Sequence, residues 1–277
     1  MVYYYFVSTN PLESRMIKEC GVKNVLVSFA YMDRFNYNLS QTRQDFDKLF
    51  MDSGAFTIRE SGKDISIHDY LAEVKKQKGI PDVVAQFDVI GDLQKTIANY
   101  KLALDIGIDW MLPIAQQDWN RGIYEFEKLL GDKLDYIGLG RHLDFYSKGV
   151  DIQRMARFTI PKKYKYHGFA KAYTQLIESN SLYSADSSSW SFGARARSSP
   201  YMTATGKGGL LFGRIGKDNR MDIYRVCEQN KDDCEACGLK VQELLDGKDV
   251  ALYKSAIALY YRPWFRKIGI FNKNFRW

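Results

Sequence analysis

The sequence has few cysteines, no long apolar run and no repeated or low-complexity tract. Four cysteines among 277 residues are too few for a disulfide framework, so we expect reduced thiols and a cytoplasmic location. No run of 18 or more apolar residues is present, which argues against a membrane-spanning helix and a membrane partner. The opening segment MVYYYFV lacks the basic region and cleavage site of a signal peptide, and it predicts a strand instead.

The composition has an excess of cations and many aromatic residues. Lys and Arg number 40 against 33 Asp and Glu, which gives a formal charge of +7, and the chain holds 19 Tyr, 16 Phe and 5 Trp. Basic side chains interleaved with aromatic rings are typical of proteins that bind a polyanion with stackable bases. The pattern indicates a nucleic-acid partner, although ordinary enzymes also carry such a charge.

Strand-like runs alternate with amphipathic helical patterns along the first 190 residues. This alternation predicts an α/β fold, and about eight repeated units favour a closed (β/α)8 TIM barrel over an open sheet. The predicted strands are Val2–Val7, Asn24–Phe29, Leu49–Asp52, Val83–Asp88, Trp110–Ala115, Tyr136–Gly140, Lys165–Gly168 and Leu182–Asp186. The predicted helices include Pro11–Cys20, Ile67–Lys78, Asp92–Asp105, Gly122–Leu130 and Ala172–Ser179.

The C-terminal quarter differs in its sequence pattern from the rest of the chain. We predict a barrel core over residues 1–206 and an appendage over 207–277 that packs on it, because the appendage is too short for a substantial core of its own. A ninth strand-like run, Leu210–Ile215, is expected to form a hairpin that turns at residues 216–219. The oligomeric state is not fixed by any of these patterns.

Polar residues stand where the predicted barrel strands end. Asp52, Asp88 and Asp186 close three strands, and Gln116 and His167 lie at or near the ends of two others. Because the carboxyl ends of parallel barrel strands converge on one mouth, we expect these side chains to line a pocket. Singly, each has an ordinary alternative: the aspartates as helix caps, Gln116 as a loop ligand and His167 as a buried structural residue.

The stretch Leu182–Arg197 combines a strand-terminal carboxylate with two cations. Asp186 is followed by small hydroxyl residues and then by Arg195 and Arg197, which can hold phosphates as forked donors. The alternative is a capping aspartate with both arginines on a solvated loop. Phe56 likewise has two readings, as a core residue or as a stacking face for a base.

Several of these segments, taken in order, resemble motifs of the tRNA-guanine transglycosylase superfamily. Asp52–Phe56, with the sequence DSGAF, resembles the Asp-Ser-Gly-Gly-Phe motif of that family. Asp186 with the two arginines resembles its nucleophilic aspartate and the basic loop that follows. Further segments that agree in order are Phe87-Asp88, PIAQ ending at Gln116, IGLG ending at Gly140, His167-Gly168, GGLLF over 208–212, and Cys234–Cys237.

The resemblance implies a base-exchange reaction at a nucleotide C1′ atom. Asp186 would be the nucleophile that forms a covalent glycosyl intermediate, and Asp52 the general acid/base. No redox or nucleotide cofactor is required. The remaining implied substrate-binding residues are Asp88 and Gln116 at the guanine edge, Ser53 and the Gly140 backbone beside them, and Phe56 and His167 on the two faces of the ring.

The chain departs from the family around its zinc site and its basic loop. The family uses three cysteines and a histidine, whereas here Cys227, Cys234 and Cys237 are not followed by any histidine. Structural zinc sites normally have four N/S ligands, so zinc is possible but is not favoured. Arg141 replaces a glycine beside the predicted base pocket, which is expected to alter the accepted base.

This compact, diverged chain is most similar to the DNA-modifying branch of the family, called DpdA, which occurs in phages and bacterial genomic islands. That branch implies DNA and a free 7-deazaguanine base as substrates, and the host cytoplasm as the location of a phage-encoded member. A tRNA enzyme is one alternative; a non-catalytic nucleic-acid-binding subunit is another, disfavoured because Asp52 and Asp186 are both present. The aromatic, basic tail from Tyr260 onward either contacts the polymer or packs on the barrel.

Overall fold

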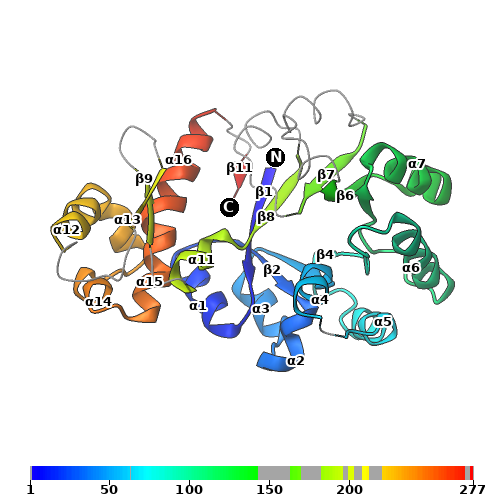
Figure 1. The fold of residues 1–277 in the computed structure, drawn as a ribbon, viewed down its shortest axis with the longest axis horizontal. Coiled ribbons are helices and arrows are strands. Elements are labelled where there is room, and N and C mark those ends of the chain that lie inside the picture. Colours follow the sequence, from blue (N-terminus) through cyan, green and yellow to red (C-terminus); the bar gives the residue numbers. More distant parts are fainter. Residues whose placement is uncertain are drawn as a thin grey trace.

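A strongly curled sheet of parallel strands forms the centre of the molecule (Figure 1). The computed structural model describes residues 2–62, 64–142, 163–169, 182–195, 199–202, 208–211, 220–271 and 275–276. Within them, eight parallel strands follow the order β4-β3-β2-β1-β8-β7-β6-β5. Their bounds are β1 Val2–Ser8, β2 Asn24–Ser28, β3 Lys48–Asp52, β4 Val83–Val84, β5 Ile114–Gln117, β6 Tyr136–His142, β7 Lys165–Gly168 and β8 Ser184–Ser187.

The two ends of this strand order approach each other. Ala85, just after β4, forms an isolated parallel bridge with Leu112, just before β5. Two hydrogen bonds accompany it: Leu112 N donates to Val84 O at 2.7 Å, and Gln86 N donates to Leu112 O at 3.0 Å. The predicted strands Val83–Asp88 and Trp110–Ala115 are therefore wrong in extent. Pro113, which has no backbone N–H to donate, separates the bridge from the regular part of β5.

Helices surround the outside of the sheet (Figure 1). They are α1 Pro11–Glu19, α2 Met32–Phe35, α3 Leu39–Asp45, α4 Ala55–Ser61, α5 Ile67–Lys76, α6 Leu93–Asp105 and α7 Trp119–Leu130, with 3-10 turns η1 Phe29–Tyr31 and η2 Gly131–Lys133. The predicted helices at α1, α5 and α6 are confirmed within two residues. The predicted helix Gly122–Leu130 begins too late. Helix α7 starts at Trp119, because Asp118 caps it by accepting a hydrogen bond from Arg121 N. The predicted helix Ala172–Ser179 lies outside the described residues.

The period-two alternation of the strands separates two apolar layers. In β1, Tyr5 points into the sheet interior, where it packs with Phe50 and Ile114. Tyr4 and Phe6 point the other way, into the larger core between the sheet and the helices. The concave side is therefore filled by side chains at mid-height.

After β8 the chain forms a short helix and a hairpin. Helix α11 spans Ser189–Arg195, and the antiparallel strands β9 Ser199–Met202 and β10 Gly208–Leu211 pair with each other. The hairpin prediction was wrong about the partner, because β10 pairs with the segment before it rather than with one after residue 216. Residues 212–219, which include the predicted turn, lie outside the described residues. The hairpin also crosses the boundary predicted at residues 206 and 207.

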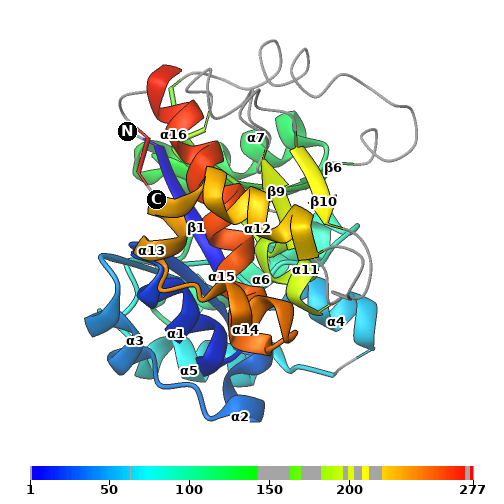
Figure 2. The same cartoon turned by 90° about the vertical axis from the view of Figure 1, so that its left-hand side faces the viewer.

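The C-terminal helices pack against the outer face of β1 and against α11 and α1 (Figure 2). Tyr261, Trp264 and Phe265 are buried, and all three rings contact Tyr4. In this part of the tail the packing interpretation is confirmed. The elements are α12 Arg220–Gln229, α13 Lys231–Ala236, α14 Val241–Leu245, α15 Asp249–Ala256, the π-helical turn η4 Ile257–Tyr261, α16 Arg262–Phe271 and the strand β11 Phe275–Arg276, which pairs with β1.

A buried carboxylate links these helices through hydrogen bonds. Asp233 of α13 accepts from Arg262 Nε at 3.0 Å and from Arg266 Nη2 at 2.5 Å, and Arg262 also donates to the Cys20 carbonyl at 3.0 Å. The network joins α13, α16 and the end of α1. Among the described residues, no helix is long and apolar enough to cross a membrane.

Candidate active site

The strand-terminal aspartates meet at one end of the curled sheet. Asp52 ends β3, Asp88 follows β4, and Asp186 lies in β8, all at the carboxyl side of their strands. The charges of Asp88 and Asp186 both act on Asp52 across the mouth. Residues distant in the chain thus form one carboxylate cluster, which the sequence predicted from strand ends alone.

A tight turn holds the Asp52 carboxyl group. Gly54 N donates to Asp52 Oδ2 at 2.9 Å, and the turn places Gly54 at φ +88°, in the left-handed region. A Cβ atom on Gly54 would lie 2.5 Å from Ala30 Cβ, so a side chain has neither the conformation nor the space there. The glycine of the DSGAF segment is therefore required by the backbone itself.

Asp52 titrates close to neutral pH. Burial raises its pKa to about 7, and the negative charges of Asp88 and Asp186 act in the same direction, while the hydrogen bond from Gly54 opposes them. A carboxyl group with this pKa exchanges a proton readily at neutral pH, as a general acid/base must. Its side chain keeps part of its surface exposed, so a substrate can reach it.

Asp88 is held by two neutral donors. Ser53 Oγ donates to Asp88 Oδ1 at 3.1 Å, and the Gln116 amide donates to Asp88 Oδ2. Burial nevertheless raises the pKa of Asp88 to about 6. The Gln116 side chain lies directly over Gly140, where a Cβ atom would come within 2.4 Å of the amide nitrogen. Gly140 therefore provides the space that lets Gln116 reach Asp88.

Asp186 is engaged by a histidine on the neighbouring strand. His167 Nε2 lies 3.1 Å from Asp186 Oδ1, and His167 Nδ1 lies 2.6 Å from Ser184 Oγ. The Ser184 hydroxyl is in turn 2.5 Å from Tyr136 Oη. A line of four polar side chains thus runs through the sheet interior and ends at Asp186.

The predicted stacking role of His167 does not fit this arrangement. Its side chain is fully buried, and the rings of Phe50 and Phe169 lie 4.6 and 4.4 Å from it by centroid. No face of the imidazole is exposed to a base, because the ring fills the interior layer. Phe56, in contrast, is 69% exposed at the start of α4, which excludes the core interpretation and leaves its ring free to stack.

The two arginines of the basic loop are only partly covered by the structure. Arg195 is the last residue of α11, and the structure describes only the backbone of this residue. Arg197 lies outside the described residues. Arg141 belongs to β6, again with only its backbone described. Phosphate binding by Arg195 and Arg197 stays a prediction.

The cysteines do not form a metal centre in the part of the chain that is described. All four are free and buried, and no group of three or more His, Cys, Asp or Glu side chains there is placed to hold a metal ion. The thiols contact in pairs, Cys20 with Cys237 and Cys227 with Cys234. Asp233, in the same segment, is bound by two arginines instead.

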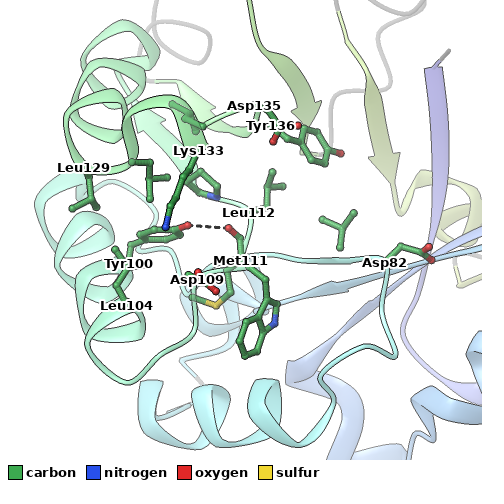
Figure 3. A pocket seen from close by; sticks show the side chains of 15 residues that line it. Asp82, Tyr100, Leu104, Asp109, Met111, Leu112, Leu129, Lys133, Asp135 and Tyr136 are labelled. Atoms are coloured by element: carbon green, nitrogen blue, oxygen red, sulfur yellow. Dashed lines mark hydrogen bonds between the residues drawn. The ribbon is translucent and has the colours of Figure 1, made fainter.

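A cavity lies at the opposite end of the strands from the carboxylate cluster (Figure 3). This cavity of about 380 Å³ opens between α6, α7 and the amino ends of β4, β5 and β6. Tyr100 donates to the Met111 carbonyl in its wall at 3.1 Å, and Leu104, Leu129 and Tyr136 also line it. This cavity is large, but it is remote from the carboxylate cluster.

Three residues near the cluster were not selected from the sequence. Ser28 is the register partner of Asp52 in the β2–β3 pair, and Ser184 and Tyr136 continue the line from His167. Ser184 carried a usable signal, because it lies two residues before Asp186 in one strand and therefore faces the same side.

No protein-family model and no curated protein matches this chain.

Proposed function

We propose that this protein is a closed (β/α)8-barrel DNA-guanine transglycosylase, which exchanges guanine in DNA for a 7-deazaguanine. The observation that carries the proposal is the cluster of Asp52, Asp88 and Asp186 at one mouth, in which the pKa of Asp52 is raised to about 7. A nucleophilic carboxylate beside a carboxyl group that exchanges protons at neutral pH is the pair that glycosidic bond exchange requires. The bridge between Ala85 and Leu112 supports closure of the barrel.

The chemistry proceeds in two balanced steps. Asp186 attacks C1′ of the target nucleotide, the C1′–N9 bond breaks with its electron pair moving to guanine, and protonated Asp52 gives its proton to the leaving base. Asp52, now ionised, takes the N9 proton of the incoming 7-deazaguanine, whose N9 attacks C1′ and releases Asp186. Asp52 thus ends each cycle protonated, so the reaction consumes no cofactor.

Base recognition falls to the groups beside Asp52. Asp88 and Gln116 hydrogen-bond each other, and they offer a carboxylate acceptor and an amide to the polar edge of a guanine. The exposed ring of Phe56 supplies a stacking surface. A guanine in duplex DNA has to leave the base stack to reach these groups, since they lie at the mouth of a barrel.

DNA rather than tRNA is the proposed polymer because the chain diverges from the tRNA enzymes in the segments that fit the substrate. The zinc-bearing segment lacks its histidine, the basic loop has different spacing, and Arg141 stands beside the base pocket. These differences support the assignment to the DNA-modifying branch of the transglycosylase superfamily. The net charge of +7 suits either polymer.

The test is an exchange assay with a labelled 7-deazaguanine base. The purified protein is incubated with the base and either duplex DNA or bulk tRNA, and each polymer is digested and analysed for labelled nucleosides. Label in DNA is the expected result. Label in tRNA alone would assign the protein to the tRNA enzymes, and no label in either, with intact polymer binding, would favour a non-catalytic subunit.

A further inference from the structure

His167 uses both ring nitrogens inside the barrel. Nε2 lies 3.1 Å from Asp186 Oδ1 and Nδ1 lies 2.6 Å from Ser184 Oγ, while Phe50 and Phe169 cover the ring. A buried imidazole with two polar partners and no access to ligand acts through those partners. Its chemical effect therefore depends on which nitrogen carries the proton.

The proton on His167 can be placed by following the hydrogen bonds from Tyr136, at the far end of the line. Burial raises the pKa of Tyr136, so its hydroxyl keeps its proton and can donate to Ser184 Oγ. The Ser184 hydroxyl then donates to His167 Nδ1, which must be the unprotonated nitrogen. The proton on Nε2 points at Asp186, whose ionised carboxylate can only accept. In this direction every link has one donor and one acceptor.

The opposite direction fails at its last link. If Nδ1 carried the proton and donated to Ser184, the lone pair of Nε2 would face Asp186 Oδ1. An ionised carboxylate at 3.1 Å from that lone pair would be repelled, so Asp186 would have to be protonated and would be a poor nucleophile.

We propose that His167 is a positioning residue for Asp186: a neutral imidazole, held as the Nε2–H tautomer by Ser184 and Tyr136, that donates to the carboxylate and fixes its plane for attack on C1′. The catalytic part of this inference rests on the proposed function. The tautomer itself rests on the hydrogen-bond chain and on Asp186 accepting at its end as a carboxylate.

The tautomer is measured on the unmodified protein by ¹⁵N NMR of the imidazole groups. The chain contains three histidines, so the variants His68→Gln and His142→Gln assign the signals by elimination. The expected His167 spectrum shows a protonated Nε2 and an unprotonated Nδ1. A protonated Nδ1, whether as the other tautomer or as an imidazolium, would overturn the proposal. This readout decides the inference even if the protein exchanges no base.

Two substitutions then separate positioning from packing. The amide nitrogen of His167→Gln can reach the place of Nε2 and donate to Asp186, whereas that of His167→Asn reaches only the place of Nδ1. The rate of covalent adduct formation should fall by about 10- to 100-fold in His167→Asn, and by clearly less in His167→Gln. DNA affinity should be unchanged in both. His68→Gln, at an exposed helix start, is the matched control.

Equal adduct rates in the Gln and Asn variants, with both folded by circular dichroism, would contradict positioning through Nε2. Ser184→Ala provides an independent check that keeps the imidazole in place. It should slow adduct formation and increase the population of the second tautomer in the ¹⁵N spectrum. A spectrum like that of the wild type would show that Ser184 does not set the tautomer. Absence of any adduct in the wild type would refute the proposed function and leave the tautomer result standing.

Discussion

At the amino ends of the parallel strands, aspartates pair with lysines. Asp82 lies 2.9 Å from Lys48, and Asp135 lies 3.2 Å from Lys165. At the carboxyl ends, Asp52 and Asp88 instead accept from hydroxyl, amide and backbone N–H groups. Burial raises the pKa of both, and the charge of Asp88 adds to the rise for Asp52. The same residue type is thus neutralised at one end and held in a proton-exchanging state at the other.

The cavity of about 380 Å³ lies at the amino end of the strands. Its wall is mainly made of Leu, Met, Trp and Tyr side chains (Figure 3). The two ends are nevertheless connected, because Tyr136 lines the cavity and also begins the hydrogen-bond line that reaches Asp186. The difference between the ends can be tested by making matched substitutions at both.

The largest effect is expected from removing the nucleophile. Asp186→Asn should abolish the covalent adduct on denaturing gels and lower base exchange by about 10⁴-fold or more, because the amide cannot attack C1′. Asp135→Asn, at the amino end of β6, is the matched control and should exchange bases at the wild-type rate. A normal adduct in Asp186→Asn would refute the nucleophile assignment, and a slow Asp135→Asn would remove the distinction between the two ends.

The next effect concerns proton transfer. Asp52→Asn should lower the rate of base exchange by about 10²- to 10⁴-fold, since the amide neither gives nor takes a proton at neutral pH. Nucleic-acid affinity, measured by fluorescence anisotropy, should stay within about twofold of the wild type because the substitution removes no phosphate contact. Exchange at the wild-type rate would contradict the general acid/base role.

A smaller effect should appear in stability as a function of pH. The pKa values of about 7 for Asp52 and about 6 for Asp88 lie above the ordinary value of 3.8, so the folded state binds more protons than the unfolded state between about pH 4 and 7. The free energy of unfolding should therefore fall as the pH rises through that window, by a few kcal/mol in total. Urea unfolding at a series of pH values measures it.

Asp52→Asn should flatten that slope and unfold at higher urea concentration than the wild type at pH 8, because it removes a charge whose ionisation the fold disfavours. Asp135→Asn should retain the wild-type slope. A wild-type stability that rises between pH 4 and 7 would contradict the electrostatic contrast between the two ends.

The smallest effect is expected in the cavity. Leu104→Phe should fill part of the 380 Å³ space and raise the free energy of unfolding by about 0.5–2 kcal/mol, with unchanged base exchange. Thermal unfolding and the exchange assay together measure both quantities. A marked change in the rate of base exchange would show that the amino end influences the site. The hydrogen-bond line from Tyr136 to Asp186 would then be the first route to examine.

The α/β alternation and the strand ends at which Asp52, Asp88 and Asp186 stand could be predicted from the sequence alone. These are local properties: a period of two fixes which side chains share a face, and parallel strands must place their carboxyl ends together. The same reasoning located Gln116, whereas the need for a glycine at position 140 became clear only from the structure. The cluster was therefore predictable without any knowledge of its internal contacts.

The contacts that those side chains make with one another could be learned only from the three-dimensional fold. His167 and Asp186 are 19 residues apart and meet because β7 and β8 are neighbours, and this makes a predicted stacking residue a buried hydrogen-bond partner of Asp186. Strand pairing likewise gave β10 an upstream partner, and helix packing placed Cys20 beside Cys237. Such contacts depend on which surfaces come together in three dimensions, and no local period in the sequence encodes that choice.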